Sequence, residues 1–204
     1  MTQKSWKEDL RELKSKTGTM NIDFDSFFFS ILLFRLVQEA EDILGSHQYV
    51  SYEDLSNLNY MGLAMKETLR LHPSVPAFTR VMEKDGELGG HRIPAGTLIN
   101  VGVYALHHSP KYWKNPENFD PERFLSQKDD NDTGCATHHA YIPFSLGPRH
   151  CIGQMFAEFE VKVLMSRFLK SFKFQLVHGQ DYGYEDPKAT LAPKDRIRCT
   201  LTLR

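Results

Sequence analysis

Residues 144–153, FSLGPRHCIG, are the stretch on which the fold and the chemistry of this chain depend. Cys151 lies in it between Gly147 and Gly153, and an amphipathic helical pattern begins directly afterwards. The thiolate is the form of cysteine that binds metals, and the N-terminus of a helix and a neighbouring cation both favour it. Arg149 supplies such a cation two residues before Cys151. The pattern therefore predicts a metal-binding cysteine at the start of a helix.

The other fixed positions of this stretch fit a flat cofactor. Gly147 and Gly153 carry no side chain, so the backbone can turn tightly or approach a planar ring there. Arg149 could pair with a carboxylate of the cofactor, and Phe144 would shield the sulfur from water. For a lone cysteine the usual alternative is a buried structural residue, since free cysteines are among the most buried residue types.

A second motif, KETLRLHP, lies at residues 66–73. Apolar residues keep helical spacing over residues 55–71, and Pro73 predicts the end of the helix. Glu67 and Arg70 are three residues apart, so they project from one helix face and can pair. Taken alone, such a pair is most often a solvated surface pair that contributes little stability.

A third motif, FDPERF, occupies residues 119–124, and the three motifs follow one another in a fixed order. The patterns E-x-x-R, P-E-R-F and F-x-x-G-x-R-x-C-x-G resemble those of the cytochrome P-450 family. The resemblance implies that Cys151 is the axial ligand of a haem b iron and that Arg149 contacts a haem propionate. It also implies a propionate contact for Arg80, which is equally well read as a plain strand arginine. Finally, it implies a buried scaffold in which Arg123 completes the Glu67–Arg70 pair.

The fold class expected is mainly α with small antiparallel β-sheets, an α+β arrangement. Residues 76–106 carry short β-like runs separated by Gly89-Gly90 and by a turn at residues 94–96, which predicts a small antiparallel sheet. Residues 172–176 and 200–203 alternate as strands. By resemblance this is the C-terminal part of the cytochrome P-450 fold.

The helix expected after Cys151 runs to about residue 170. Its apolar stripe is interpreted mainly as core, and its cations have two interpretations. They form either a basic docking face for an acidic reductase or a solvated helix face. The stripe consists of Ile152, Phe156, Phe159 and Val163, and the cations are Lys162, Arg167, Lys170 and Lys173.

Members of the family carry an A/G-G-x-D/E-T element on a distal, oxygen-activating helix, and this element does not occur in the sequence. The resemblance begins at about Arg35, so we expect a poorly matched N-terminal segment at residues 1–34 and a haem-binding portion at residues 35–204. The apolar run at residues 27–34 is interpreted as a buried helix or strand. We hypothesise that the distal helix has been skipped between about residues 29 and 34, and no catalytic residue is assigned.

The net charge, the cysteine count and the longest apolar run indicate which partners and which cellular compartment to expect. The formal net charge is −1, so nothing in the charge balance indicates nucleic-acid binding. Three scattered cysteines do not form a disulfide framework, which favours a reducing compartment. The longest apolar run is far shorter than the roughly 20 residues that span a bilayer, so we expect no transmembrane segment. The resemblance implies that intact eukaryotic relatives are anchored in the endoplasmic reticulum membrane. This chain is expected to be cytoplasmic or membrane-peripheral.

The resemblance implies a haem-thiolate monooxygenase that receives electrons from an NADPH-dependent reductase and oxidises a lipophilic small molecule. The strings FSLGPRHCIGQMFAEFEVKVLM and TLAPKDRIRCTL look closest to the branch of sterol side-chain hydroxylases such as cholesterol 24-hydroxylase, which makes a sterol a candidate substrate. The alternative is a truncated remnant that binds haem without turnover, or an unstable fragment.

Overall fold

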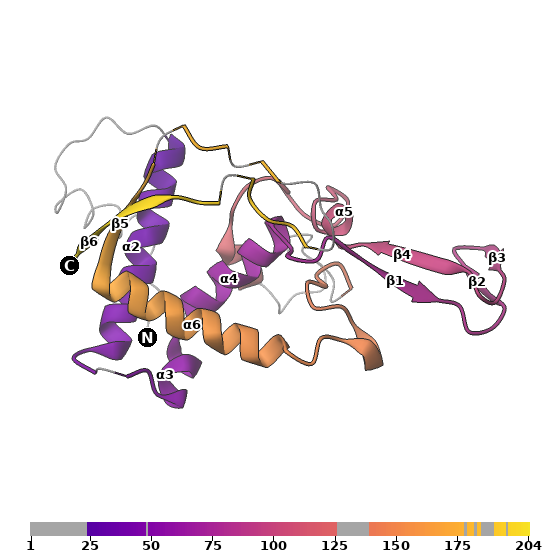
Figure 1. Cartoon of the computed structure of the whole chain (residues 1–204), viewed down its shortest axis with the longest axis horizontal. Coiled ribbons are helices and arrows are strands. Elements are labelled where there is room, and N and C mark those ends of the chain that lie inside the picture. The colour runs from indigo at the N-terminus through magenta and orange to yellow at the C-terminus, as the bar shows by residue number, and fades with distance from the viewer. Residues whose placement is uncertain are drawn as a thin grey trace. The chain divides into compact units, whose positions relative to one another are not determined.

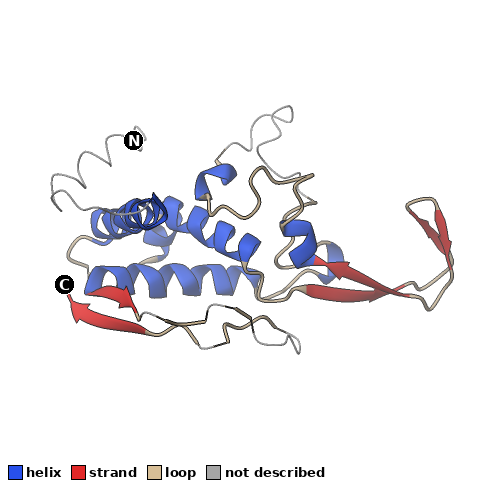
Figure 2. Ribbon diagram, turned by 90° about the horizontal axis from the view of Figure 1, so that it is seen from above, coloured by secondary structure: helices blue, strands red, loops and turns tan. Residues whose placement is uncertain are grey.

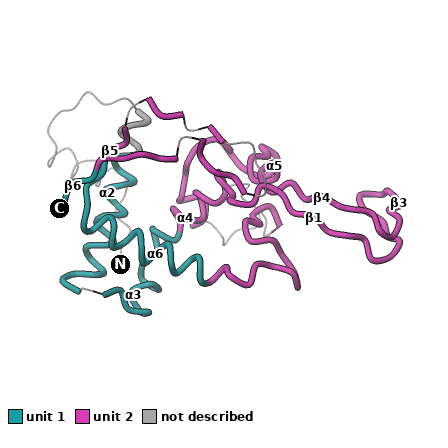
Figure 3. The backbone as a smooth tube through the Cα atoms, in the orientation of Figure 1, with its two compact units in different colours: residues 1–62, 156–175, 201–204 teal, residues 63–155, 176–200 magenta. Residues whose placement is uncertain are grey.

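The computed structural model describes residues 24–47, 49–125, 139–177, 179–181, 183–184, 190–194 and 196–204 (Figure 1). Helices and three two-stranded sheets make up the described chain (Figure 2), which matches the expected fold class. The chain divides into two compact units (Figure 3). The first contains residues 1–62, 156–175 and 201–204, and the second contains residues 63–155 and 176–200.

In the first unit, helix α2 (Phe24–Leu44) continues through the apolar run and ends at Gly45, which adopts a positive φ of 46°. The expected C-cap glycine is confirmed, because a residue without Cβ takes this conformation at low cost. The predicted boundary between residues 34 and 35 falls inside α2. None of the described helices is both long enough and apolar enough to cross a bilayer. Buried apolar residues of this unit are Leu32, Leu36, Val37, Ala40, Leu44, Leu55, Leu58, Met61 and Leu169.

The helix predicted over residues 55–71 is two helices, α3 (Tyr52–Asn57) and α4 (Asn59–Leu71). Ser51 begins α3 with a capping box, in which its hydroxyl accepts from the Asp54 amide and its own amide donates to the Asp54 carboxylate. The start of α4 is capped by Glu39 of α2, whose carboxylate accepts from the amides of Tyr60 and Met61 at 2.6 and 2.8 Å. This contact from a distant residue explains the break, which local periodicity does not show.

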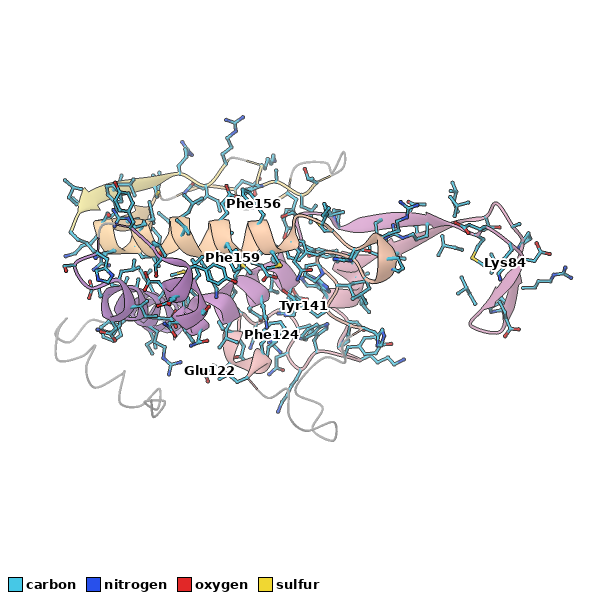
Figure 4. All side chains as sticks on the ribbon, turned by 90° about the horizontal axis from the view of Figure 1, so that it is seen from below. Lys84, Glu122, Phe124, Tyr141, Phe156 and Phe159 are labelled. Carbon is cyan, nitrogen blue, oxygen red and sulfur yellow. The ribbon has the colours of Figure 1, made fainter. Side chains whose placement is uncertain are left out.

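Helix α6 (Gln154–Ser171) follows the cysteine as predicted, but its apolar stripe is only partly buried. Phe159 packs edge to face on Tyr52, with ring centroids 5.6 Å apart. By contrast, Ile152 is 100% exposed and Phe156, labelled with Phe159 in Figure 4, is 71% exposed. The core interpretation is therefore wrong for Ile152 and Phe156, because no described part of the chain covers them.

Three cations of α6 are partly buried and bind backbone carbonyls within the first unit. Lys162 Nζ donates to the carbonyl of Leu55 at 2.7 Å, and Lys170 and Arg167 donate to carbonyls just beyond the end of α2. Carbonyls in the last turn of a helix lack partners within the helix and carry partial negative charge, so cations stabilise them. Lys173 is exposed, and Arg167 and Lys170 make their contacts at exposed positions, so the solvated-face interpretation is wrong only for Lys162, whose contact is partly buried.

The second unit contains the predicted antiparallel strands. β1 (Ala77–Val81) pairs with β4 (Leu98–Gly102), and β2 (Gly86–Leu88) pairs with β3 (His91–Ile93) at the far end of the same ribbon (Figure 1). The two further strands predicted from alternation, β5 (Phe172–Leu176) and β6 (Cys199–Leu203), pair with each other, and most of their residues belong to the first unit.

Short helices and an aromatic cluster complete the second unit. Helix α5 (Val103–His107) and the 3₁₀ turns η1 (Pro121–Phe124) and η2 (Gly147–Arg149) lie in this part of the chain. Trp113, Phe124 and Ala140 are buried together, and the rings of Phe124 and Tyr141 meet edge to face (Figure 4). This cluster packs between the segments that carry the second and third motifs and the segment that leads to the cysteine.

Candidate functional site

The cysteine lies in a hydrogen-bonded loop that opens into α6. The Cys151 amide donates to the Phe144 carbonyl at 2.8 Å, and the His150 amide donates to the Gly147 carbonyl at 3.0 Å. Gly147 adopts a φ of +76°, which is the left-handed conformation that favours glycine. The thiol of Cys151 is free and exposed. The loop therefore presents a sulfur at the surface of this chain, immediately before a helix, instead of burying it as a structural cysteine.

Two other predicted positions surround the sulfur. A Cβ added at Gly153 would lie 3.8 Å from Cys151 Sγ, in ordinary van der Waals contact, so Gly153 lies directly beside the sulfur. Phe144 is half-buried, and its carbonyl holds the loop closed. Arg149 is exposed and makes no hydrogen bond or ion pair to any residue that the structure describes. Its guanidinium is therefore available to a ligand.

Arg80 reaches the cysteine loop from β1. Its Nη2 donates to the hydroxyl of Ser145 at 2.8 Å, and its guanidinium carbon lies 4.5 Å from the centroid of the Phe78 ring. Ser145 adopts a φ of +64°, which is unusual for a residue with a Cβ. Arg80 is thus tied to the loop, although it lies 65 residues earlier in the sequence. Ser145 was not predicted, and no sequence signal marks its conformation.

The E-x-x-R pair is buried and joins the arginine of the third motif. Glu67 Oε2 accepts from Arg70 Nε at 2.8 Å, and Glu67 Oε1 accepts from Arg70 Nη2 at 2.9 Å and from Arg123 Nε at 3.0 Å. The amide of Asp120 donates to the same Oε1 at 2.9 Å. Glu67 and Arg70 are fully buried, and the Arg123 side chain is 4% exposed. The structure therefore brings all three motif residues into one network.

Two guanidinium groups around one carboxylate leave an excess positive charge, which backbone carbonyls offset. The carbonyl of Asn118 accepts from both Arg70 and Arg123, at 3.2 and 3.1 Å, and the carbonyl of Lys114 accepts from Arg123 at 3.0 Å. Every buried side-chain nitrogen and oxygen among the described residues has a partner. A buried ion pair stabilises only when its remaining donors are satisfied, and this condition is met here.

His107 is a buried group of this region to which the sequence assigned no role. It is 0% exposed, and the Arg70 guanidinium donates to its backbone carbonyl at 2.9 Å. Burial lowers the pKa of His107 to about 4, so its imidazole is neutral near pH 7. A single histidine in an apolar segment gives no spacing pattern, so only the folded chain shows its partners.

The donor set fits a haem held by one cysteine. Haem iron in thiolate-ligated proteins takes a single protein sulfur on its proximal side, and two carboxylate arms of the porphyrin need cations. Cys151 supplies the exposed sulfur, and Arg80 and Arg149 are cations of the cysteine loop and its neighbour. Within the described ranges no three His, Cys, Asp or Glu side chains gather as they would around a bare metal ion.

Comparisons with known proteins agree with this geometry. The family model described as Cytochrome P450 matches residues 33–200. Cytochrome P450 4c21 of Blattella germanica is 44% identical over 71% of this chain and 28% of its own length. Cytochrome P450 4c3 of Drosophila melanogaster is 37% identical over 83% of this chain and 31% of its own length. Among solved structures, retinoic acid bound cyanobacterial CYP120A1 matches with a TM-score of 0.76 and 28% identity, covering 98% of this chain and 42% of that chain.

These relatives correct the predicted branch. They carry the names of family 4, including Cytochrome P450 4V2 of Homo sapiens, which is 46% identical over 66% of this chain and 25% of its own length. The assignment to the cholesterol 24-hydroxylase branch is therefore not supported. That assignment used two strings, one around the cysteine and one at the C-terminal strand. At these positions a cofactor and a sheet would restrict the residues more than the substrate does. The sterol was a candidate substrate only because of that branch, so it is not supported either.

The chain spans about a quarter to a third of the length of the curated relatives that it matches. Within that span, the family model covers most of the chain and includes all three motifs and the loop that carries Cys151. From its sequence match and its fold, the chain belongs to the cytochrome P450 family.

Proposed function

We propose that residues 35–204 are the haem-binding portion of a haem-thiolate monooxygenase and that Cys151 is the axial ligand of haem b iron. The observation that carries this proposal is the free, exposed thiol at the end of a closed loop, directly before α6. In that role, the Cys151 thiolate would hold the haem iron and raise its electron density.

The other residues of the loop would bind and orient the cofactor. Arg149, which is unpaired among the described residues, would meet one propionate, and Arg80 would meet a propionate while Ser145 holds its guanidinium. Gly153 would keep the space beside the sulfur open. Phe144 would exclude water from the sulfur and, through its carbonyl, fix the position of the Cys151 amide.

Glu67, Arg70 and Arg123 would act as a scaffold and not as reacting groups. Their network joins α4 to the segment of residues 107–123, and its full burial separates it from solvent and from substrate. A charge network of this kind fixes a long irregular segment in one conformation, because each alternative would bury an unpaired charge.

When bound, the haem would supply the activation of dioxygen: with two electrons from an electron donor and two protons, one oxygen atom would enter a substrate C–H bond and the other would leave as water. We propose an NADPH-dependent reductase as the electron donor and a lipophilic small molecule as the substrate class, both from family membership. The sequence contains no A/G-G-x-D/E-T element, so no distal acid or threonine is assigned in this chain. A haem-binding portion without turnover of its own is the second candidate.

A carbon monoxide difference spectrum tests the ligand. The chain is expressed with haem supplied and reduced, and its spectrum is compared with those of Cys151→Ala and Cys199→Ala. Cys199 is the matched control, because it is also a free and exposed cysteine. We expect a strongly red-shifted Soret band in the wild type and in Cys199→Ala, and its loss in Cys151→Ala. A band that survives in Cys151→Ala would overturn the assignment.

Turnover separates the two candidates. The haem-loaded chain is supplied with NADPH and a cytochrome P450 reductase, and oxygenated product is measured for a panel of lipophilic substrates. Product formation that requires Cys151 supports the monooxygenase. NADPH-independent haem binding with the red-shifted band but with no product across the panel supports the remnant.

A further inference from the structure

His107 makes two side-chain hydrogen bonds inside the second unit, and both go to backbone groups. Its Nδ1 lies 3.2 Å from the carbonyl oxygen of Arg70 on α4, and its Nε2 lies 2.9 Å from the amide nitrogen of Ile142. The imidazole stacks on Tyr141, with ring centroids 5.5 Å apart and planes 19° from parallel, and Trp113 meets it at an edge. The ring is therefore stacked on one face by Tyr141, in edge contact with Trp113, and hydrogen-bonded at both nitrogens.

These two contacts specify one protonation state. An amide N–H can only donate, so the Ile142 amide requires a lone pair on Nε2. The proton of the neutral imidazole then lies on Nδ1, where it can donate to the carbonyl of Arg70. The imidazolium form would place a second N–H against the Ile142 amide and lose that bond. Full burial disfavours the charged form as well.

The position of Ile142 explains why its hydrogen bond with His107 affects the cysteine loop. Ile142 lies two residues before Phe144, whose carbonyl accepts from the Cys151 amide, and the Ile142 carbonyl accepts from the Ser145 amide at 3.1 Å. His107 thus forms a bridge from the helix of the Glu67–Arg70 pair to the segment that enters the cysteine loop. The Arg70 guanidinium also donates to the His107 carbonyl, so main chain and side chain of His107 both bind Arg70.

We propose that His107 is a positioning residue, which sets the placement of the cysteine loop by holding the Ile142 amide at a fixed distance from Arg70. The proposal rests on the proposed role of Cys151 as the haem ligand. It predicts that the acceptor at the Nε2 position matters for the geometry of the sulfur, beyond any contribution of His107 to stability.

Two substitutions separate the acceptor from the donor. In His107→Gln, the side-chain oxygen can reach the former Nε2 position and accept from the Ile142 amide. In His107→Asn, the shorter amide can donate to the Arg70 carbonyl but cannot reach Ile142. Both variants remove the ring, so they lose similar packing against Tyr141. Val103→Ala is the control for packing on α5, because Val103 is 1% exposed and makes no side-chain hydrogen bond.

The first measurement is amide hydrogen exchange resolved at Ile142. Loss of one buried hydrogen bond is expected to speed exchange by about five- to tenfold in His107→Asn, while His107→Gln stays close to the wild type. Equal exchange rates in the two variants would overturn the proposal. This measurement needs no haem, so it tests the bridge even if Cys151 proves not to be the ligand.

The second measurement is the fraction of bound haem that gives the red-shifted, thiolate-type carbon monoxide band. We expect a severalfold lower fraction in His107→Asn than in His107→Gln, and a fraction near that of the wild type in Val103→Ala at a similar loss of thermal stability. A fraction that simply follows stability across all three variants would mean a structural role only and overturn the proposal.

The test also covers a variant that fails to fold and a wild type that shows no thiolate band. If His107→Asn does not fold, His107→Gln decides alone, with retained protection of Ile142 and a retained thiolate band in support and loss of both against. If the wild type itself shows no thiolate band, the proposed function fails, and Ile142 exchange then reports the bridge separately.

Discussion

Arg123 Nε donates to Glu67 Oε1 across 3.0 Å, although the two residues are 56 positions apart in the sequence. Both side chains are almost fully buried, and Arg70 binds the same carboxylate through two nitrogens. The pair therefore ties the 3₁₀ turn η1 to α4.

Replacing the shared carboxylate of Glu67 should strongly destabilise the folded chain. We expect Glu67→Gln to lower the free energy of unfolding by about 3–5 kcal/mol, because two buried guanidinium groups would lose their counter-charge. Urea unfolding followed by circular dichroism measures this loss. Arg92→Met is the control, since Arg92 and Asp85 form an ion pair whose side chains are 84% and 56% exposed, and its unfolding midpoint should not move. Equal midpoints for the two variants would contradict the assigned burial.

The positive φ of Ser145 predicts which of two substitutions at this position leaves the protein more stable. Ser145→Gly should be more stable than Ser145→Ala by about 1 kcal/mol, because both lose the Arg80 contact but only glycine adopts the left-handed conformation without a Cβ penalty. At Ser166, which is buried within α6, the order should reverse by about 1 kcal/mol in favour of alanine. Thermal unfolding of the four variants checks both orders, and the same order at both sites would contradict the backbone argument.

The buried imidazole of His107 should make stability depend on pH. Its pKa is about 4 in the folded chain and 6.5 in the unfolded chain, so below pH 6.5 the unfolded state takes up a proton that the folded state does not. Stability is therefore fully present above pH 6.5 and falls as the pH drops towards 4, by up to about 3 kcal/mol from this group. Arg70 and His108 act in the same direction, because their positive charges oppose protonation of His107.

Comparison with His107→Gln isolates this contribution. Carboxylates titrate in both proteins, including Glu39, whose pKa is raised by burial, so their effects cancel in the difference between the two pH profiles. Urea midpoints measured from pH 7 to pH 4 should converge as the pH falls, because only the wild type carries the histidine. Parallel profiles would show that His107 does not titrate as its burial requires.

Lys162 should act as a helix cap. We expect Lys162→Met to destabilise the first unit by about 1 kcal/mol, since the Leu55 carbonyl in the last turn of α3 loses its charged donor. Lys173→Met should have no effect on the unfolding midpoint, because Lys173 is exposed. Amide exchange in α3 locates the change. If Lys162→Met leaves both the midpoint and α3 exchange unchanged, Lys162 is not a cap.

Several features of this chain could be predicted from the sequence because they depend on local physics or on short fixed spacings. Gly45 ends α2, Ser51 and Asp54 cap α3, and the Gly89-Gly90 turn closes a hairpin, all through conformations that single residues favour. The three motifs and their order indicate the family, because fixed spacings between specific residues can be recognised without knowledge of the fold.

Other features were decided by contacts between residues far apart in the sequence. The break between α3 and α4 depends on a carboxylate from α2, Arg80 meets Ser145 across 65 residues, and His107 finds Ile142 across 35. Periodicity reports which face of an element is apolar, but it does not report which distant group will satisfy a given donor or acceptor. The sequence thus determined the family, most of the elements and, by resemblance, the group of Glu67, Arg70 and Arg123. The tertiary structure alone decided the hydrogen bonds that no motif indicates, such as those of Glu39 and His107, because burial makes each polar group require a partner.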